Sequence, residues 1–249
     1  MLPGFAYVRP TSIAEAVRHL AAPEALAHAG GTDLIGALRD GAVTARTLVS
    51  LSALSELRGI FTLPDGALRI GALATLAEIA AHPLVRERYA ALADGAAAAA
   101  SPQIRNQGTL GGNICQRPRC WYFRGDFDCP RKGGAACFAV GGENQYHAIF
   151  GGDGCYMVHP SDTAAPLVAL EALVRIAGPP GTRVIPLESF FRLPAQDLTH
   201  ENVLGPGELV VEVVLPPPAE GARSSYRKFR ARAAWDFALA GAAVALRVR

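Results

Sequence analysis

The sequence lacks the features of several classes of protein. It has no run of basic residues and no basic patch interleaved with aromatic side chains, which argues against nucleic-acid binding. No apolar run approaches the roughly 18 residues that a membrane-spanning helix needs. The first residues show no charged segment followed by an apolar one, so they predict no signal peptide. We therefore expect a cytoplasmic protein without a membrane span, or a periplasmic one if a partner carries the export signal.

Charge is also scarce. Only 18% of the 249 residues are charged, half are hydrophobic, and the net charge is +2. This composition is typical of a well-packed globular protein and argues against disorder. The length allows one large domain or two small ones.

Cysteine is absent outside one short stretch, where positions 115, 120, 129, 137 and 155 hold all five. A disulfide-stapled secreted protein usually spreads an even number of cysteines over its length, so metal binding is favoured. The C-x2-4-C pairs of compact zinc sites are missing. Four thiolates can hold either a zinc ion or an iron–sulfur cubane, and the spacing leaves both open.

The same stretch is basic. Arginines and a lysine outnumber its aspartates, and they would stabilise an anionic cluster. A solvated loop or a surface that meets a partner subunit would have the same composition. These residues are Arg117, Arg119, Arg124, Arg131 and Lys132, against Asp126 and Asp128. His147 and His159 are further possible ligands, although structural roles are favoured for both.

Hydrophobic periodicity predicts three segments of an α/β protein. Residues 1–57 read as strand, helix, strand, helix and strand, the order of a small parallel unit. Residues 58–218 contain further strands and helices, with an irregular insertion at about 115–155, and three prolines mark their end. Residues 219–249 begin a third domain that ends abruptly on a strand, as if incomplete.

Individual elements follow from caps and breakers. Ser12 with Glu15, and Thr75 with Glu78, form capping-box patterns. The expected helices lie in residues 13–20, 32–41 (N-capped by Thr32 and stopped by Gly41), 75–83 (stopped by Pro83) and 86–100. The expected strands are 5–10, 24–31 (buried), 45–51, 68–73 and 207–218, and residues 162–176 read as a helix followed by a strand.

Two glycine pairs are candidates for phosphate binding. Gly30 and Gly31 separate a strand from a helix, and Gly111 and Gly112 stand in a predicted glycine turn. Glycine lets backbone N–H groups approach a phosphate closely, and a helix N-terminus adds further donors. Neither pair belongs to the G-x-G-x-x-G fingerprint or to a P-loop, so each alone would also suit an ordinary turn. Asp33 would repel a phosphate unless it caps the helix or points away.

Taken in order, these segments resemble the FAD-binding subunit of the xanthine dehydrogenase and molybdenum hydroxylase family. The matching segments are FAYVRPTSIAEAV, AGGTDLI, IGALATLAEI, SPQIRNQGTLGGNI, HPSDTAAPLVALEA, GELVVEVVLP and YRKFRARAAWDFA, and they cover essentially the whole chain. The resemblance implies a two-lobed α/β (α+β) FAD-binding domain of the vanillyl-alcohol-oxidase (PCMH) type. An iron–sulfur insertion and a truncated C-terminal α+β domain complete the expected fold.

The resemblance also implies the cofactor-binding residues. Backbone amides of the first glycine segment would wrap the FAD pyrophosphate, and the second segment would form the opposite wall. These residues are Ala29, Gly30, Gly31, Thr32, Asp33 and Leu34, then Thr109, Leu110, Gly111, Gly112 and Asn113. Asp162 would hold a polar part of FAD. Lys228, one of only two lysines, would contact the flavin, with a surface charge as the alternative. Phe190 and Phe191 would lie near the flavin ring or pack in the core.

The cysteine-rich stretch resembles the insertion of 4-hydroxybenzoyl-CoA reductase and of bacterial aldehyde oxidoreductase flavin subunits. RPRCWYF and GENQYHAIFG make the aldehyde oxidoreductase type the nearer one. The resemblance implies a [4Fe–4S] cluster on Cys120, Cys129, Cys137 and Cys155, with Cys115 left over.

The function that the resemblance implies is electron transfer in an oxidoreductase. A molybdopterin-binding large subunit would act on the substrate, a [2Fe–2S] small subunit would relay electrons, and the FAD would exchange them with an external acceptor. No catalytic acid–base set is expected in this chain, because the cofactors carry the chemistry. The alternatives are a free-standing flavin oxidase or dehydrogenase of the same fold and a non-redox scaffold stapled by zinc.

Overall fold

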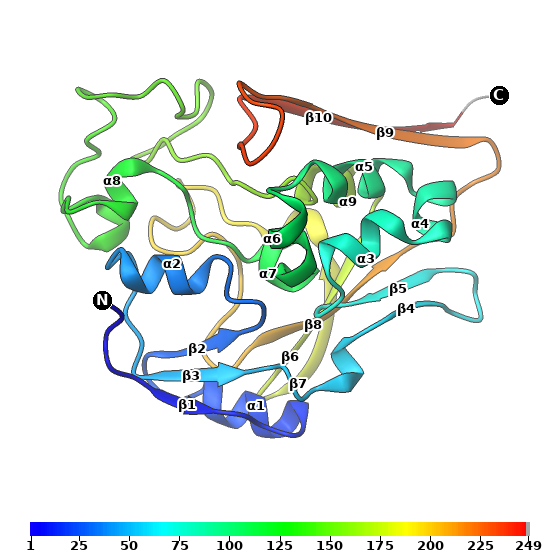
Figure 1. Cartoon of the computed structure of the whole chain (residues 1–249), viewed down its shortest axis with the longest axis horizontal. Coiled ribbons are helices and arrows are strands. Elements are labelled where there is room, and N and C mark those ends of the chain that lie inside the picture. The colour runs from blue at the N-terminus through cyan, green and yellow to red at the C-terminus, as the bar shows by residue number, and fades with distance from the viewer. Residues whose placement is uncertain (248–249) are drawn as a thin grey trace.

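The N-terminal residues form the parallel unit that the sequence predicts. The computed structural model describes residues 1–247, and its first three strands pair in the order β1-β3-β2, all parallel (Figure 1). Two helices connect them, because parallel strands need crossover connections. The elements are β1 (Ala6–Val8), α1 (Ile13–Leu20), β2 (Ala25–His28), α2 (Leu34–Arg39) and β3 (Thr47–Ser50). The prediction of a buried strand at 24–31 is wrong in one respect: β2 is an edge strand, so it is only half-buried.

The predicted capping box of α1 is half formed. The Ser12 hydroxyl accepts a hydrogen bond from the Glu15 amide at 3.2 Å. The Glu15 carboxylate, however, accepts from the Thr11 amide at 2.8 Å rather than from Ser12. The capping box of α3 (Leu76–Ala81) is complete, with Thr75 and Glu78 bonded in both directions.

The start of α2 differs from the prediction. Its N-cap position is Asp33 rather than Thr32, and the Asp33 side chain makes no capping hydrogen bond. Its carboxylate instead faces arginines of the insertion. The predicted stop is confirmed, since Gly41 follows the helix with φ of +68°.

A five-stranded antiparallel sheet forms the next layer, in the order β4-β5-β8-β6-β7. The predicted strand at 207–218 is its central strand, β8, and six of the seven β8 residues are buried. The strands are β4 (Ile60–Thr62), β5 (Leu68–Gly71), β6 (Leu173–Gly178), β7 (Gly181–Pro186) and β8 (Leu209–Leu215). Short 3-10 helices η1 (Ser55–Leu57) and η3 (Leu187–Phe190) adjoin it.

Helices lie between this sheet and a C-terminal hairpin (Figure 1). The hairpin of β9 (Ala222–Phe229) and β10 (Ala240–Arg247) is antiparallel and contacts α5 and α9. The helices are α3, α4 (Pro83–Arg88), α5 (Ala90–Ala98), α6 (Pro102–Gln107), α7 (Leu110–Ile114) and α9 (Ala164–Ala169). The main core combines sheet residues such as Ile70 and Val213 with helix residues such as Ile79 and Leu92. Residues 248 and 249, the end of the predicted third segment, lie outside the described residues.

Two predictions about this helical layer are wrong. The alanine-rich helix expected at 86–100 is divided into α4 and α5, because Tyr89 leaves helical geometry at φ −136°. Pro83 does stop α3, but it also begins α4, since proline suits the first turn of a helix. The glycine turn expected around Gly111 and Gly112 is a short helix, α7, whose N-cap Thr109 accepts a hydrogen bond from Gly112 at 3.2 Å.

The insertion at 115–155 is irregular, as predicted. Its helical pieces are α8 (Trp121–Arg124) and η2 (Pro130–Lys132). It packs on α2, since Ala37 of that helix shares an apolar cluster with Phe123 and Cys129. The insertion therefore lies beside the first glycine segment, which precedes α2 (Figure 1).

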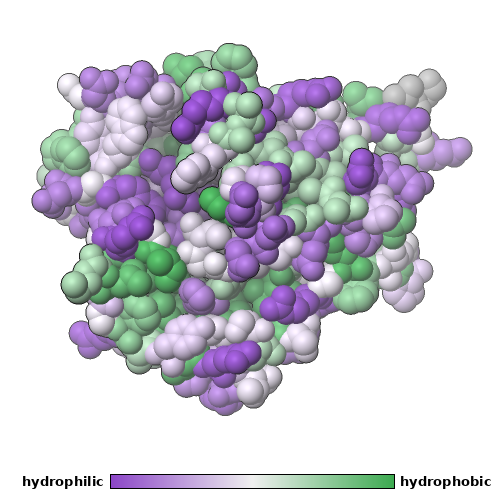
Figure 2. Space-filling model, viewed as in Figure 1, coloured by the Kyte–Doolittle hydropathy of each residue, from purple (hydrophilic) through white to green (hydrophobic). Residues whose placement is uncertain are grey.

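Within residues 1–247, no helix is both long enough and apolar enough to cross a bilayer. On the face drawn in Figure 2, hydrophilic and hydrophobic residues are interspersed.

Candidate functional site

The two glycine segments, more than seventy residues apart in the chain, meet in space. Gly30 packs so closely on the carbonyl group of Gln107 that a Cβ atom at position 30 would overlap its oxygen. Gly31 has φ of +71°, which favours glycine. The first segment (29–34) is therefore held by backbone contact, which only glycine permits, against the end of α6, two residues before the second segment (109–113) begins.

Both segments line one cavity of about 340 Å³. The predicted residues on its wall are Ala29, Gly30, Gly31, Thr32, Asp33, Leu34, Thr109, Gly111 and Gly112. Leu110 turns instead into the hydrophobic core and is fully buried. Gly111 lies against the backbone of Ala72, so a side chain there would also displace the wall.

Asn113, the last residue of the second segment, anchors the loop that carries Asp162. Its Oδ1 accepts hydrogen bonds from the Ser161 and Thr163 hydroxyls, each at 2.6 Å. The predicted second wall and the predicted acidic residue are thus joined through short side chains.

Asp162 and Lys228, both predicted to bind cofactor, pair with each other. Lys228 Nζ lies 2.7 Å from Asp162 Oδ2, and both side chains are buried. The Tyr226 hydroxyl donates to Asp162 Oδ1 at 2.9 Å. Burial, and secondly the Asp162 charge, raise the pKa of Tyr226, so this hydroxyl stays protonated. Lys228 also donates to the Ala98 carbonyl at 3.2 Å, so two of the three donors of its ammonium group are engaged.

A second cavity of about 630 Å³ lies on the Asp162 side. Asp162, Tyr226 and Phe237 border it together with Cys120 and Trp121 of the insertion. Lys228 does not line either of these two cavities, and the same holds for Phe190 and Phe191. Phe190 is fully buried in the main core, as the packing interpretation predicts.

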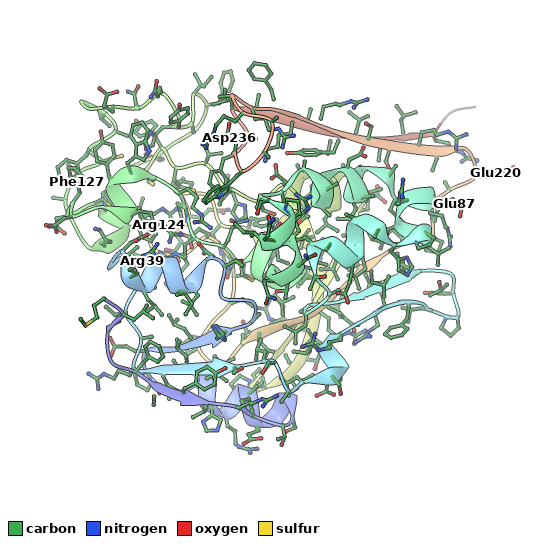
Figure 3. The ribbon with its side chains drawn as sticks, in the orientation of Figure 1. Arg39, Glu87, Arg124, Phe127, Glu220 and Asp236 are labelled. Carbon is green, nitrogen blue, oxygen red and sulfur yellow. The ribbon has the colours of Figure 1, made fainter. Side chains whose placement is uncertain are left out.

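Asp33 does not face a phosphate site with a free carboxylate. Its oxygens accept from the Arg117 amide at 2.8 Å and from Arg124 Nη2 at 2.6 Å, and Arg119 Nη2 lies 3.0 Å away. Figure 3 shows Arg124 where α8 faces α2. The repulsion that the sequence predicts between this carboxylate and a phosphate is therefore offset by the insertion.

The predicted cluster ligands are free thiols. Cys129, Cys120 and Cys137 belong to one apolar cluster, and Cys155 is buried. Arg131 Nε donates to Cys155 Sγ at 3.3 Å. Within residues 1–247, no group of three or more histidine, cysteine or acidic side chains is arranged to hold a metal ion.

Cys120 is the thiol with the richest polar surroundings. Burial raises the pKa of the Cys120 thiol, and hydrogen bonds from the amides of Phe123 and Tyr122 lower it. The nearby thiols of Cys155 and Cys129 raise this pKa by smaller amounts. His147 Nε2 lies 3.2 Å from Cys120 Sγ. Cys115 differs, because burial raises the pKa of its thiol to about 12 and keeps it protonated.

Sequence reasoning missed two charged residues of this region. Glu201 is buried and lies 2.9 Å from Arg117 Nε, and it also pairs with Arg131. Nothing in its local sequence marks it as special, because its partners stand at least seventy residues away. Arg117 was predicted only as part of a basic loop, yet it lines the smaller cavity.

The family of the chain follows from a match to a family model. Residues 3–218 match the FAD binding domain in molybdopterin dehydrogenase. The chain therefore belongs to this family of FAD-binding domains.

Among named relatives, the chain is 40% identical over 245 residues to the aldehyde oxidoreductase FAD-binding subunit PaoB of Escherichia coli, covering 96% of this chain and 76% of that protein. It is 30% identical over 247 residues to the carbon monoxide dehydrogenase medium chain of Hydrogenophaga pseudoflava, covering 98% of this chain and 70% of that protein.

A solved structure shares the fold. Carbon monoxide dehydrogenase from Hydrogenophaga pseudoflava superposes with a TM-score of 0.76 at 27% sequence identity, covering all of this chain and 71% of that chain. The mixed α/β fold predicted from the sequence is thereby confirmed.

Proposed function

We propose that this chain is the FAD-binding, electron-transferring subunit of a heteromeric molybdenum hydroxylase of the aldehyde oxidoreductase or xanthine dehydrogenase type. The observation that carries the proposal is that both glycine segments line one cavity, with Gly30 packed against Gln107 just before the second segment. Family membership supports FAD as the ligand. The chain is then an oxidoreductase component whose own side chains position a cofactor.

The diphosphate of FAD would lie in the 340 Å³ cavity, between residues 29–34 and residues 109–112. Glycine at positions 30 and 31 lets the backbone N–H groups of the first segment approach phosphate oxygens closely. The amides of Gly111 and Gly112 already donate to the Ala72 carbonyl at 2.9 Å and to the Thr109 hydroxyl at 3.2 Å, so these two glycines would form a close wall rather than donors. The flavin ring would occupy the 630 Å³ cavity that Asp162 borders. Bound FAD would supply the redox chemistry, and the chain would bind it, orient it and exclude water from it.

Lys228 acts on this site through Asp162. Its ammonium and the Tyr226 hydroxyl fix both carboxylate oxygens, so Asp162 presents one defined orientation to the larger cavity. A positioning lysine is a different role from the direct flavin contact that the resemblance implies.

We also infer a [4Fe–4S] cluster as a second cofactor, although the thiols of residues 1–247 do not already stand together as a metal-binding group. Three of the four thiols share one apolar cluster and the fourth accepts a hydrogen bond from a buried guanidinium, an arrangement that stabilises an anionic sulfur. We assign Cys120, Cys129, Cys137 and Cys155 as the ligands, which would converge on the metal. Cys115 lines the 340 Å³ cavity instead and is not among the assigned ligands.

The predicted domain division fits this arrangement. Residues 1–57 would be one flavin lobe, residues 58–218 the second lobe with the insertion, and residues 219–249 the start of a further domain. Tyr226 and Lys228 of that last segment would hold Asp162 in place from the hairpin. The relatives are named as a FAD-binding subunit and a medium chain, which supports partner subunits, and we infer that these are a molybdopterin-binding subunit and a [2Fe–2S] subunit.

Cofactor analysis of the purified full chain tests the proposal. We expect a yellow-brown protein that releases FAD on denaturation and contains iron and acid-labile sulfide, and that co-purifies with a molybdopterin subunit. A protein that contains flavin but no iron would contradict the proposed cluster and leave the proposed flavin site standing. A preparation that binds zinc but no FAD, even after anaerobic reconstitution with FAD, iron and sulfide, would overturn the proposed function.

A further inference from the structure

Arginines of the insertion leave an excess of buried positive charge beside the glycine segments. Asp33 is paired with Arg119 and Arg124, and Glu201 with Arg117 and Arg131, all within 3.0 Å. Each carboxylate thus faces two guanidinium groups. Asp40 balances part of this charge from 4.0 Å, at the limit of an ion pair with Arg124.

These guanidinium groups also carry unused hydrogen-bond donors. Within residues 1–247, one buried nitrogen of each of the four arginines has no acceptor. The atoms are Arg117 Nε, Arg119 Nε, Arg124 Nη1 and Arg131 Nη2. Arg117 Nε lies 2.9 Å from Glu201, so the charges attract, but its N–H is not aligned with that oxygen. Buried donors without acceptors are costly. Because the Arg117 Nε itself faces Glu201, it is the surplus of guanidinium charge over carboxylate charge that points to an anion in the cavity that Arg117 lines.

The position of Arg117 indicates which anion. It lines the 340 Å³ cavity together with Gly31 and Gly112, where the diphosphate would lie. The helices that follow the two glycine segments have only six and five residues, so their dipoles contribute little charge there. A doubly charged diphosphate therefore needs a cation from elsewhere in the chain.

We propose that Arg117, contributed by the cysteine-rich insertion, is a FAD-binding residue that provides the counter-charge for the diphosphate. This inference rests on the proposed function, because it takes FAD as the ligand of that cavity. The insertion then has a role in flavin binding besides holding the cysteines.

Several contacts hold Arg117 in place for this role. Its backbone amide donates to Asp33 at 2.8 Å, its Nη2 donates to the Thr199 carbonyl at 3.1 Å, and its guanidinium lies 4.9 Å from the centre of the Phe123 ring. Because Asp33 is neutralised by Arg119 and Arg124, it does not cancel the charge of Arg117. Glu201 is shared with Arg131, which leaves the pair of arginines with net positive charge.

The test compares ligands with and without phosphate. Using the full chain stripped of flavin, dissociation constants of FAD, ADP and riboflavin are measured for wild type and for Arg117→Gln. We expect the substitution to weaken the binding of FAD and of ADP by about tenfold or more. The affinity for riboflavin should hardly change, since riboflavin lacks the diphosphate. Arg117→Lys, which keeps the charge but loses the planar fork, should fall between the two.

Arg39→Gln is the matched control. It removes the same charge from the exposed face of α2, where the side chain is 67% exposed, and should leave all three constants unchanged. Figure 3 shows Arg39 on this helix. Unchanged FAD and ADP affinities in folded Arg117→Gln would overturn the inference, as would an equal loss for all three ligands.

A wild-type chain that binds neither FAD nor ADP would instead overturn the proposed function itself. If Arg117→Gln does not fold, hydrogen exchange of the wild type decides the question. ADP should slow exchange of the amides of Gln116, Arg117 and Arg119, and unaltered exchange there at saturating ADP would contradict the role of Arg117.

Discussion

Lys228 and Asp162, 66 residues apart in the chain, form a buried ion pair with Nζ and Oδ2 separated by 2.7 Å. The pair links the C-terminal hairpin to the loop before α9 and fixes the carboxylate that borders the larger cavity. Both partners were predicted as cofactor residues from the sequence. Their mutual contact shows that one supports the other.

Lys228→Met should be strongly destabilising, because it leaves the Asp162 carboxylate buried without its cation. Loss of one partner of a buried pair costs about 3–5 kcal/mol. Denaturant unfolding measures the change, and the double variant Lys228→Met/Asp162→Asn should lose less than the two single losses added together. Lys132→Met, which removes only a bond to the Gly125 carbonyl, is the control. Strictly additive losses would show that the two side chains do not depend on each other.

Gly30→Ala should destabilise the chain by about 1–3 kcal/mol and abolish tight FAD binding, because its Cβ would push the first glycine segment away from the Gln107 carbonyl at the end of α6. Gly36→Ala makes the same change in α2, where a Cβ meets nothing within 4 Å. It should stabilise the helix by up to about 1 kcal/mol. Unfolding and flavin titration of both variants give the comparison, and equal behaviour of the two would contradict the close packing at Gly30.

Stability should rise with pH between about 4 and 6.5 through His159. Burial is the main cause that lowers the pKa of this imidazole to about 4, and the charge of Arg131 lowers it further. The hydrogen bond with the Ile114 backbone and the charge of Asp33 raise the pKa and so oppose the shift. In this range the unfolded chain binds a proton that the folded chain does not, so unfolding is favoured as the pH falls. His159→Gln should flatten the pH dependence of the unfolding free energy by at most about 3 kcal/mol over that range. An identical slope in variant and wild type would show that His159 does not titrate differently on folding.

Cys137→Ser should remove most of the iron and the iron–sulfur absorption while leaving most of the flavin. Four thiolates are needed to hold the cluster. Cys137 does not line the 340 Å³ cavity, so its loss should not disturb the flavin. Cys115→Ser is the matched control and should retain the iron. Full iron content in Cys137→Ser would refute the ligand assignment.

Much of the local structure could be predicted from the sequence alone. The parallel order of the first three strands, the capping box at Thr75, the stop at Gly41 and the buried strand β8 all follow from neighbouring residues. Such signals act over a few positions, through side-chain volume, capping hydrogen bonds and backbone freedom.

Only the tertiary structure decided how the candidate site is assembled. The sequence indicated two glycine segments and a basic insertion, but Asp33 meets Arg124 across 91 residues and Gly30 meets Gln107 across a helical layer. The helix α7 was missed for a local reason, because Thr109 caps it through the amide of Gly112 although a glycine pair favours a turn. Contacts between distant residues depend on the path of the whole chain, because packing and charge pairing select partners that no local pattern encodes.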